Sequence, residues 1–327
     1  MTFSIASLAV SRNVCLAPMS GVTDVAYRTL ARRYGAPLMA SEMLAAALLA
    51  ERPSRCPDFS REAPLMVQLM GADPGVMARA GRIVADRGAA IIDVNMGCPV
   101  RKVVANGCGA ALMRDPDRAV RVVEALVRAV AVPVSVKMRL GWDETDRNAA
   151  SLARRLEEAG AALITVHGRT RQQLYAGAAD WAAVREAVGA VRVPVVVNGD
   201  VTDGASARAA LSASGAAAVM VGRAACGRPW LAGRLAAELA LGGAPGTPPV
   251  AERRDLLLEQ LDLMGRFYGM LPGLRAARKH LSWATREMPG ACSFRRRIFA
   301  AETHAEARAL IVGFFDRADN EKGRTAA

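Results

Sequence analysis

The sequence predicts an α/β fold, a (β/α)8 TIM barrel followed by a small all-α helical bundle. Two observations lead to this prediction. Eight short apolar runs, rich in β-branched residues, alternate with longer Ala-, Leu- and Arg-rich stretches typical of helices, and the alternation stops after a linker. Strands that alternate with helices indicate βαβ units in a parallel sheet, and eight units in about 240 residues match the size of this barrel. A doubly wound open sheet is the alternative, because periodicity alone does not show that a sheet closes.

Each expected strand is a continuous apolar run, as suits strands covered by helices on both faces. In chain order the runs occupy residues 14–19, 37–41, 65–69, 91–95, 134–138, 163–167, 195–198 and 218–221. The longest step separates the fourth and fifth runs and contains Gly97, Cys98 and Pro99, then a glycine-rich segment at 106–109. Long structured loops are often functional, so we expect this loop to belong to a site.

Glycine and proline are dense in the segment LGGAPGTPPV at 241–250, which indicates a linker. Beyond it the sequence shows only helical patterns. We therefore expect a barrel domain over residues 1–242, a helical domain over 250–318 and a disordered tail over 319–327.

The composition excludes a disordered chain and a small disulfide-stapled domain, since 52% of the 327 residues are hydrophobic and 23% are charged. At this length roughly 75% of the unfolded chain's surface can be buried. No apolar run approaches the ~18 residues of a membrane span, and no basic segment precedes the first apolar residues as in a secretory signal. The six cysteines are scattered, which suits a reducing compartment. We expect a cytoplasmic protein with no membrane partner, no metal and no obligate protein partner.

The chain is strongly basic, with 43 Lys and Arg residues against 31 Asp and Glu and a formal net charge of +12. Such a charge favours a polyanionic partner. An Arg-rich coding bias is the alternative explanation, because few of these residues are lysines. The lysines are Lys102, Lys137, Lys279 and Lys322, and their scarcity makes each a candidate for a specific role.

Polar side chains and glycines follow the expected strands, and in a parallel barrel these positions meet at one mouth. The candidates are Pro18, Met19, Ser20, Glu42, Gln68, Asn95, Cys98, Lys137, Arg139, His167, Asn198, Gly199, Asp200, Gly222 and Arg223. Gln68, Lys137 and His167 each interrupt an apolar run, where a buried polar group is costly unless it has a partner. The glycines after the last two strands, together with Arg223, favour a phosphate site.

Lys137, at the end of the fifth strand, suits three chemistries: a Schiff base, a phosphate contact, or stabilisation of an anionic ring. A reduced isoalloxazine carries negative charge near N1 and O2, which an ammonium group would stabilise. The Gln68 amide is both donor and acceptor and suits the pyrimidine edge of such a ring. A flavin is therefore one interpretation, and a lysine-dependent aldolase is another.

A series of motifs covers every expected strand and continues into the helical region. In order they are LAPMSGVTDVAYRTL, MASEM, PLMVQLMG, IIDVNMGCPVRKVV, VSVKMRLGW, ITVHGRT, VVNGDV, VMVGRA, ARKHLSW and FRRRIF. Together they resemble the tRNA-dihydrouridine synthases, and among these the bacterial B-type subfamily. DVNMGCP is the most specific of them.

The resemblance implies a barrel that binds FMN non-covalently and uses NADPH to reduce particular uridines of tRNA to 5,6-dihydrouridine. By this resemblance the flavin ring would meet Pro18, Met19, Ser20, Gln68 and Lys137, with His167 beside it, and its phosphate would meet Asn198, Gly199, Asp200, Gly222 and Arg223. Hydride would pass from flavin N5 to C6 of the uracil, Cys98 would protonate C5, and Asn95 would face the base. One departure is Cys108, which replaces a small residue of the family pattern.

An RNA substrate requires a cationic surface, and the helical region supplies one. Between residues 266 and 297 the sequence has eight basic residues against a single acid. On a helix over 274–288, Arg275, Arg278, Lys279 and Arg286 fall within an arc of about 100°, opposite an apolar face. We expect these four residues to contact tRNA phosphates, which position a nucleic acid without specifying its sequence. A solvated helix face is the alternative. Arg101, Lys102 and Arg139 are further expected substrate contacts.

The preferred hypothesis is therefore an FMN-dependent, NADPH-driven tRNA-dihydrouridine synthase. A flavin-dependent dehydrogenase of a free pyrimidine, of the dihydroorotate type, is the enzymatic alternative, although a small substrate has no need of the basic helical region. A barrel that binds RNA without catalysis is the alternative from another class.

Overall fold

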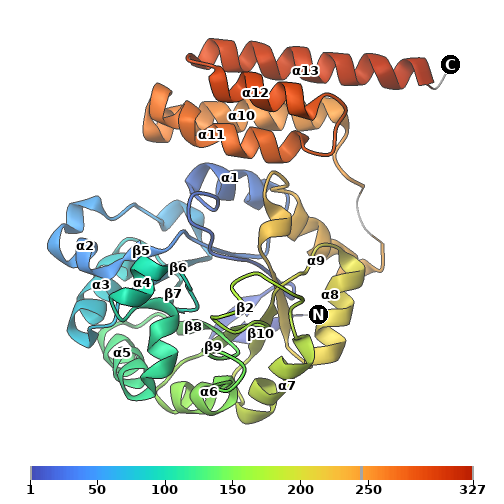
Figure 1. The fold of residues 1–327 in the computed structure, drawn as a ribbon. Coiled ribbons are helices and arrows are strands. Elements are labelled where there is room, and N and C mark those ends of the chain that lie inside the picture. Colours follow the sequence, from blue (N-terminus) through green and yellow to red (C-terminus); the bar gives the residue numbers. More distant parts are fainter. Residues whose placement is uncertain (1, 244–245, 326–327) are drawn as a thin grey trace.

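The computed structural model describes residues 2–243 and 246–325, and a closed parallel barrel forms its larger part (Figure 1). The barrel strands are β3 (Val14–Leu16), β4 (Leu38–Ala40), β6 (Leu65–Met70), β7 (Ile91–Met96), β8 (Val134–Arg139), β9 (Leu163–His167), β10 (Val195–Asn198) and β11 (Ala218–Val221). Neighbouring strands pair in parallel, and β11 pairs with β3, with Val219 opposite Val14. The ring is thus closed. This confirms the predicted barrel, and the open sheet is excluded.

Helices surround the barrel and bury their apolar faces against it. They are α1 (Val25–Arg33), α2 (Ala46–Glu51), α3 (Pro74–Asp86), α4 (Arg101–Ala105), α5 (Pro116–Ala129), α6 (Ala149–Glu158), α7 (Trp181–Ala190), α8 (Gly204–Ser214) and α9 (Leu231–Leu241), with short turns η1 (Pro53–Arg55), η2 (Ser60–Glu62), η3 (Gly109–Arg114) and η4 (Arg223–Ala225). Aspartate side chains cap several N-termini; Asp73, for example, accepts a hydrogen bond from the Val76 amide at 2.7 Å. The two-residue strand β5 (Leu44–Ala45) adds to β6.

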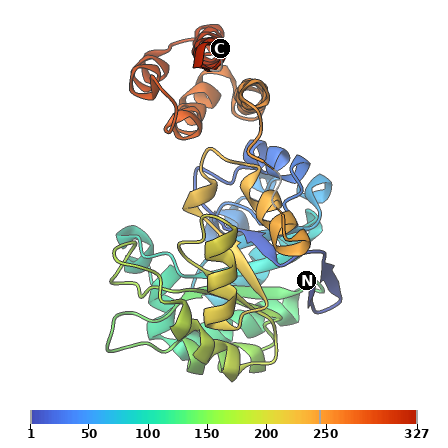
Figure 2. The ribbon, with the colours of Figure 1, turned by 90° about the vertical axis from the view of Figure 1, so that its right-hand side faces the viewer.

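An N-terminal hairpin closes the end of the barrel opposite the strand-to-helix loops (Figure 2). Its strands are β1 (Phe3–Ile5) and β2 (Leu8–Val10), and the side chains of Phe3, Ile5 and Val10 join a buried cluster inside the barrel. The sequence did not predict this hairpin, because three-residue strands are too short to show periodicity.

Four helices form the C-terminal bundle, which lies over α1 (Figure 1). They are α10 (Val250–Tyr268), α11 (Met270–Thr285), α12 (Ala291–Ala300) and α13 (His304–Thr325). The bundle has its own apolar core, which Ala26 and Leu30 of α1 complete. The backbone of α13 is helical to Thr325, through most of the segment 319–327 for which the sequence predicts disorder, and residues 326–327 lie outside the described part.

Two properties of the described residues bear on the environment of the protein. All six cysteines are free thiols there. Within residues 2–243 and 246–325, the helices lack the length and apolar character that crossing a bilayer requires.

Candidate active site

The inside of the barrel is apolar at one end and polar at the other. Leu38, Met66, Ile91 and Leu163 line the end near the N-terminal hairpin. Further along these strands, every second side chain points into the same interior, and these side chains are polar. They are Gln68, Asp93, Asn95, Ser135, Lys137, Thr165, His167 and Asn198. The polar end is the mouth where the strand-to-helix loops emerge, which is where barrel enzymes carry out chemistry.

A chain of hydrogen bonds leads from the barrel interior to the Cys98 loop. The Asp93 carboxylate accepts from the Ser135 hydroxyl at 2.7 Å and from Gln68 Nε2 at 2.6 Å. Asn95 Nδ2 donates to Gln68 Oε1 at 2.7 Å, and Asn95 Oδ1 accepts from the backbone N–H of Cys98 at 2.9 Å. Each of these bonds joins a donor to an acceptor, so Asp93 fixes the orientation of both amides. We call these five residues the Asp93 chain.

Sequence reasoning missed Asp93. Its signal is the alternation in IIDVNM, which places Asp93 on the same face of β7 as Asn95. The side chain is fully buried, and burial raises its pKa to about 6, against the opposing effects of the hydrogen bonds from Gln68 and Ser135 and of the Lys137 charge. At neutral pH Asp93 is therefore an anion inside the barrel.

Lys137 presents its ammonium group toward the mouth. Lys137 Nζ donates to Asn198 Oδ1 at 2.8 Å, and Asn198 Nδ2 donates to the carbonyl of Met220 at 2.8 Å, so the amide is held in place. The pKa of Lys137 is lowered to about 8. Burial is the main cause, the positive charge of the neighbouring Arg139 adds to it, and the charge of Asp93 opposes both. At pH 7 most of this lysine is a cation, as the sequence-based hypothesis requires.

Cys98 is half-buried on the loop between β7 and α4. Its carbonyl accepts from the Ala110 amide at 3.0 Å, and Arg139 Nε donates to the carbonyl of Gly97 at 2.8 Å. Gly109 has a φ of +61°, and a Cβ there would lie 2.7 Å from the Cys98 carbonyl oxygen. The loop is therefore braced from both sides. Glycine at 109 lets the two segments meet.

Arg139 is 2% exposed and joins two loops of the mouth. Besides Gly97, its guanidinium donates to the carbonyls of Thr170 and Leu174, both at 2.9 Å, and lies 5.6 Å from the ring centre of Tyr175. The structure thus gives Arg139 a bracing role. The expected contact with substrate stays a prediction.

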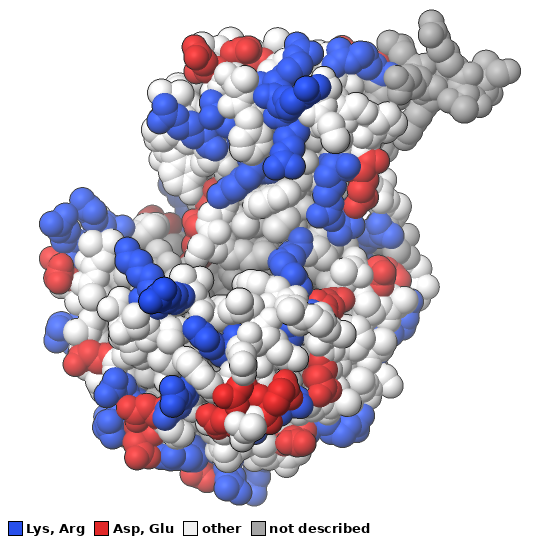
Figure 3. All heavy atoms as spheres, in the orientation of Figure 1, with Lys and Arg blue, Asp and Glu red and all other residues white. Residues whose placement is uncertain are grey.

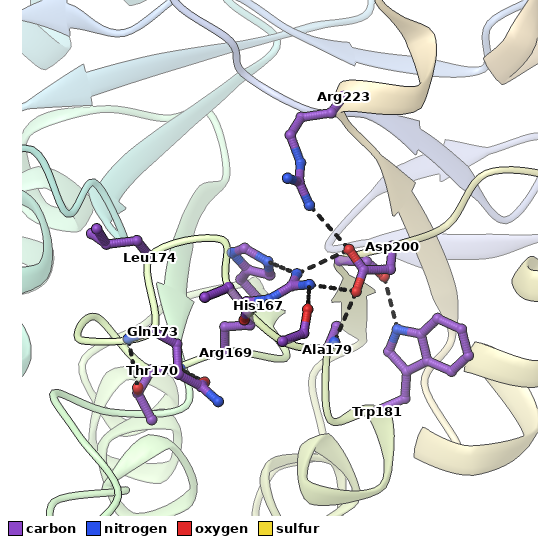
Figure 4. Close-up of polar contacts among 12 residues, drawn as sticks. His167, Arg169, Thr170, Gln173, Leu174, Ala179, Trp181, Asp200 and Arg223 are labelled. Atoms are coloured by element: carbon purple, nitrogen blue, oxygen red, sulfur yellow. Dashed lines mark hydrogen bonds and ion pairs between the residues drawn. The ribbon is translucent and has the colours of Figure 1, made fainter.

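Asp200 lies at the centre of a cluster of arginines after β10 (Figure 4). Its carboxylate accepts from Arg169 at 2.5 and 3.0 Å, from Arg223 at 3.0 Å and from the Ala179 amide at 2.8 Å. A carboxylate repels phosphate and this one is already paired, which argues against its side chain as the phosphate contact that the resemblance implies. It orients the arginines instead, and only its backbone N–H stays a predicted phosphate contact. The Arg223 side chain is 56% exposed and keeps free donors.

His167 lies next to this cluster and is uncharged. Burial and the positive charges of Lys137 and nearby arginines lower its pKa to about 2. Its Nε2 lies 3.4 Å from Arg169 Nη1. Gly199 has a φ of +118°, and a Cβ there would lie 2.9 Å from the His167 ring. Gly199 therefore allows the β10 loop to approach the histidine closely, and its carbonyl accepts from Trp181 Nε1 at 2.8 Å (Figure 4).

The loop after β3 brings Pro18, Met19 and Ser20 beside the end of β11. The Ala17 amide donates to the Val221 carbonyl at 2.9 Å, and Met19 N donates to Thr23 Oγ1 at 2.9 Å. Pro18 and Met19 are half-buried and Ser20 is exposed. The Met19 sulfur lies 3.9 Å from the Cβ position of Gly222. The structure thus brings the predicted N-terminal and C-terminal cofactor residues together.

The predicted basic face of α11 is only partly available to a ligand. Arg275 and Arg286 are exposed, and the flanking Arg101 and Lys102 on α4 are exposed as well. Arg278, in contrast, donates to the carbonyl of Ala301 at 2.6 Å, within the bundle. Helical periodicity places a residue on a face but does not show what packs against that face.

Lys279 also differs from the expectation, because its ammonium group lies against Gly21 of the loop after β3. The next residue, His280, is buried, and its Nε2 lies 3.2 Å from the Gly21 carbonyl oxygen. Arg278 and Lys279 are half-buried and thus contact the bundle and the barrel, and their expected contacts with tRNA stay predictions. Figure 3 shows Lys and Arg side chains over the bundle and around the hollow between the bundle and the barrel.

Comparisons with known proteins agree with this arrangement. The family model described as dihydrouridine synthase (Dus) matches residues 15–319. A protein of Rhodobacter capsulatus named probable tRNA-dihydrouridine synthase is 48% identical over 96% of this chain and 98% of its own length. The tRNA-dihydrouridine synthase B of Xanthomonas campestris is 42% identical over 94% of each chain.

Solved structures with low sequence identity share the barrel fold. Morphinone reductase in complex with tetrahydroNAD matches with a TM-score of 0.54 at 14% identity, over 77% of this chain and 93% of its own. The old yellow enzyme homologue of Zymomonas mobilis matches with a TM-score of 0.54 at 12% identity, over 77% of this chain and 95% of its own. The family model and the relatives above cover nearly the whole sequence, and the chain belongs to the dihydrouridine synthase family.

Proposed function

We propose that this protein is a tRNA-dihydrouridine synthase of the B type, which uses FMN and NADPH to reduce uridines of tRNA in the cytoplasm. The names of its relatives support the substrate. The observation that carries the proposal is the Asp93 chain, because it holds the backbone of a cysteine-bearing loop at a barrel mouth that also presents a buried lysine.

The donor set at the mouth fits a flavin. Gln68 uses one amide hydrogen and one oxygen lone pair within the Asp93 chain and keeps the others for the pyrimidine edge of a ring. The Lys137 ammonium would hold the electron-rich N1 and O2 side, and a positive charge there favours the reduced form. Arg223 and the backbone around Gly199 and Gly222 would bind the FMN phosphate.

A flavin bound there would supply hydride to C6 of the uracil, and the chain's own residues would complete the reduction. Cys98 would donate a proton to C5 from the face of the base opposite the flavin. Asn95 and Arg139 hold the loop that carries this thiol, through the amide of Cys98 and the carbonyl of Gly97. Positioning of this kind has large effects on rate.

A uridine in a folded tRNA must leave its stack to enter the mouth. The exposed cations Arg101 and Lys102 of the barrel domain and Arg275 and Arg286 of the bundle would bind phosphates of the tRNA. Such contacts are sensitive to salt and independent of sequence.

The test is an in vitro assay with purified protein, FMN, NADPH and an unmodified tRNA transcript, followed by nucleoside mass spectrometry. We expect dihydrouridine in the tRNA and no reduction of free uridine or orotate. Turnover of the free pyrimidines with none of tRNA would replace this proposal with the small-molecule dehydrogenase. A protein that stays colourless with FMN but binds tRNA would replace it with the non-catalytic RNA-binding barrel.

A further inference from the structure

A cavity with no lining residue from the polar interior of the barrel borders the loop that carries Cys98. It has a volume of about 680 Å³ and is enclosed by the start of α2, the β6–α3 turn, α4 and α5. Figure 1 shows these helices side by side at one edge of the barrel. No residue lining this cavity belongs to the cofactor site described above, and only Lys102 among them is an expected substrate contact. Its volume falls in the range of small-molecule sites.

The lining combines apolar walls with three cations. Met70, Val76 and Val103 contribute apolar surface, and Lys102, Arg118 and Arg121 contribute positive charge. Such a lining suits a ligand with a flat apolar ring and an anionic group, in which the cations hold the anion and the walls hold the ring.

The cations retain capacity for a ligand. Arg118 forms an exposed ion pair with Asp115, with 3.2 Å between Nε and Oδ2, and its other donors remain. Within the described residues, Lys102 and Arg121 make no ion pair. The carboxylate of Asp73 lines the cavity but caps α3 through the Val76 amide. The cavity is therefore electropositive.

The cavity and the thiol share one loop. Lys102 and Cys108 line the cavity, whereas Cys98, at the start of the same loop, is half-buried and lies outside this lining. The Cβ position of Gly109 lies 3.1 Å from the Cβ of Cys98, so the two sides of the loop are close together. Met70, which lines the cavity, lies two residues beyond Gln68 on β6, so the cavity adjoins the barrel mouth.

We infer that this cavity holds the 2′-phosphorylated adenosine of NADPH while the nicotinamide reaches the barrel mouth. The inference rests on the proposed function, which requires a dinucleotide reductant. The adenine ring would lie against Met70, Val76 and Val103, and Arg118 and Arg121 would bind the 2′-phosphate. These two arginines would then make the enzyme prefer NADPH over NADH.

The test uses the FMN-loaded full-length protein and the double variant Arg118→Glu/Arg121→Glu. The matched control is Arg128→Glu, which reverses a charge on the same helix where the side chain is 71% exposed and pairs with Glu124 instead of the cavity. Three quantities are compared: the Kd of 2′,5′-ADP by calorimetry, the KM for NADPH and NADH in flavin reduction without tRNA, and the Kd of tRNA.

We expect the double variant to weaken 2′,5′-ADP binding and to raise the KM for NADPH by about tenfold or more, with the KM for NADH and the Kd of tRNA within about twofold of wild type. The control should match wild type in all three. Unchanged 2′,5′-ADP binding and unchanged NADPH kinetics would overturn the inference. A loss of tRNA affinity without any change in NADPH kinetics would also overturn it, because the cavity would then serve an RNA nucleotide.

The proposed function is tested separately by replacing NADPH with dithionite. Wild-type protein that forms dihydrouridine with dithionite has the proposed activity, whatever the result for the cavity. Wild-type protein that forms none with either reductant lacks the proposed activity, and the assignment of the cavity falls with it.

Discussion

Replacing Asp93 tests whether a buried carboxylate orients the loop that carries Cys98, the proposed proton donor. Two uncharged substitutions separate the hydrogen bonds from the charge. Asparagine keeps an oxygen that accepts from Gln68 Nε2 and can donate to the Ser135 hydroxyl, whereas leucine offers no acceptor. Asp93→Leu therefore frees the Gln68 amide to rotate, and Asn95 loses the fixed partner that aligns its oxygen with the Cys98 amide.

The structure sets the expected magnitudes. A pKa raised from 3.8 to about 6 means that ionised Asp93 costs the folded state about 3 kcal/mol at neutral pH. Both substitutions remove this cost. Leucine destabilises the folded state by about 1–3 kcal/mol, because it leaves a buried Gln68 donor without its partner. The free energy of unfolding of Asp93→Leu is thus expected to lie within about 2 kcal/mol of the wild-type value. Its kcat is expected to fall roughly 100-fold, because a displacement of Cys98 by about 1 Å has an effect of that size on rate.

The assays are single-turnover formation of dihydrouridine and denaturant unfolding at two pH values. We expect Asp93→Leu to lose kcat with little change in the KM for NADPH, and Asp93→Asn to stay within about fivefold of wild type. The folded state of wild type binds the Asp93 proton more tightly than the unfolded state, so this residue's contribution to stability is present below about pH 4 and is lost as the pH rises through about 6. Neither variant should show that slope.

Wild-type kcat in Asp93→Leu would refute the idea that the Asp93 chain positions Cys98. An Asp93→Asn variant as slow as the leucine variant would assign the effect to the lost negative charge near Lys137 instead of the hydrogen bonds.

Cys98→Ala should keep the yellow colour and be reduced by NADPH, yet form little dihydrouridine; normal turnover would remove Cys98 as the proton donor. Lys137→Ala should weaken FMN binding by roughly 10–100-fold in a fluorescence titration. Because the pKa of Lys137 is about 8, the FMN affinity of the wild type should fall as the pH rises past that value. Equal FMN affinity in the two proteins would contradict the proposed role of Lys137 in flavin binding. Arg275→Glu should weaken tRNA binding in a salt-dependent way without changing the melting temperature, whereas Arg278→Glu should lower the melting temperature because its hydrogen bond to the Ala301 carbonyl is lost. The reverse pattern would show that the roles of the exposed Arg275 and the half-buried Arg278 were assigned wrongly.

The barrel was predictable because each strand is a continuous apolar run. All eight runs became strands, and β9, β10 and β11 have the expected bounds. The polar residues at their ends were predictable as well, because Gln68 and Lys137 interrupt apolar sequence.

Partnerships across the fold were not predictable from periodicity. Asp93 lies on the same strand face as Asn95, but its role depends on Gln68 and Ser135 of neighbouring strands. Asp200 follows a strand as a phosphate-binding residue would, yet two arginines from other loops neutralise it. Such contacts are set by strand register and by the course of the loops, which a single sequence does not encode locally.

The central claim is tested most directly by mapping dihydrouridine in the tRNA of a strain that lacks this protein. The account predicts that specific uridines lose the mass gain of two hydrogen atoms, that the wild-type gene restores it, and that a gene encoding Cys98→Ala does not. Unchanged dihydrouridine at every position, in a strain without another enzyme of this family, would contradict it.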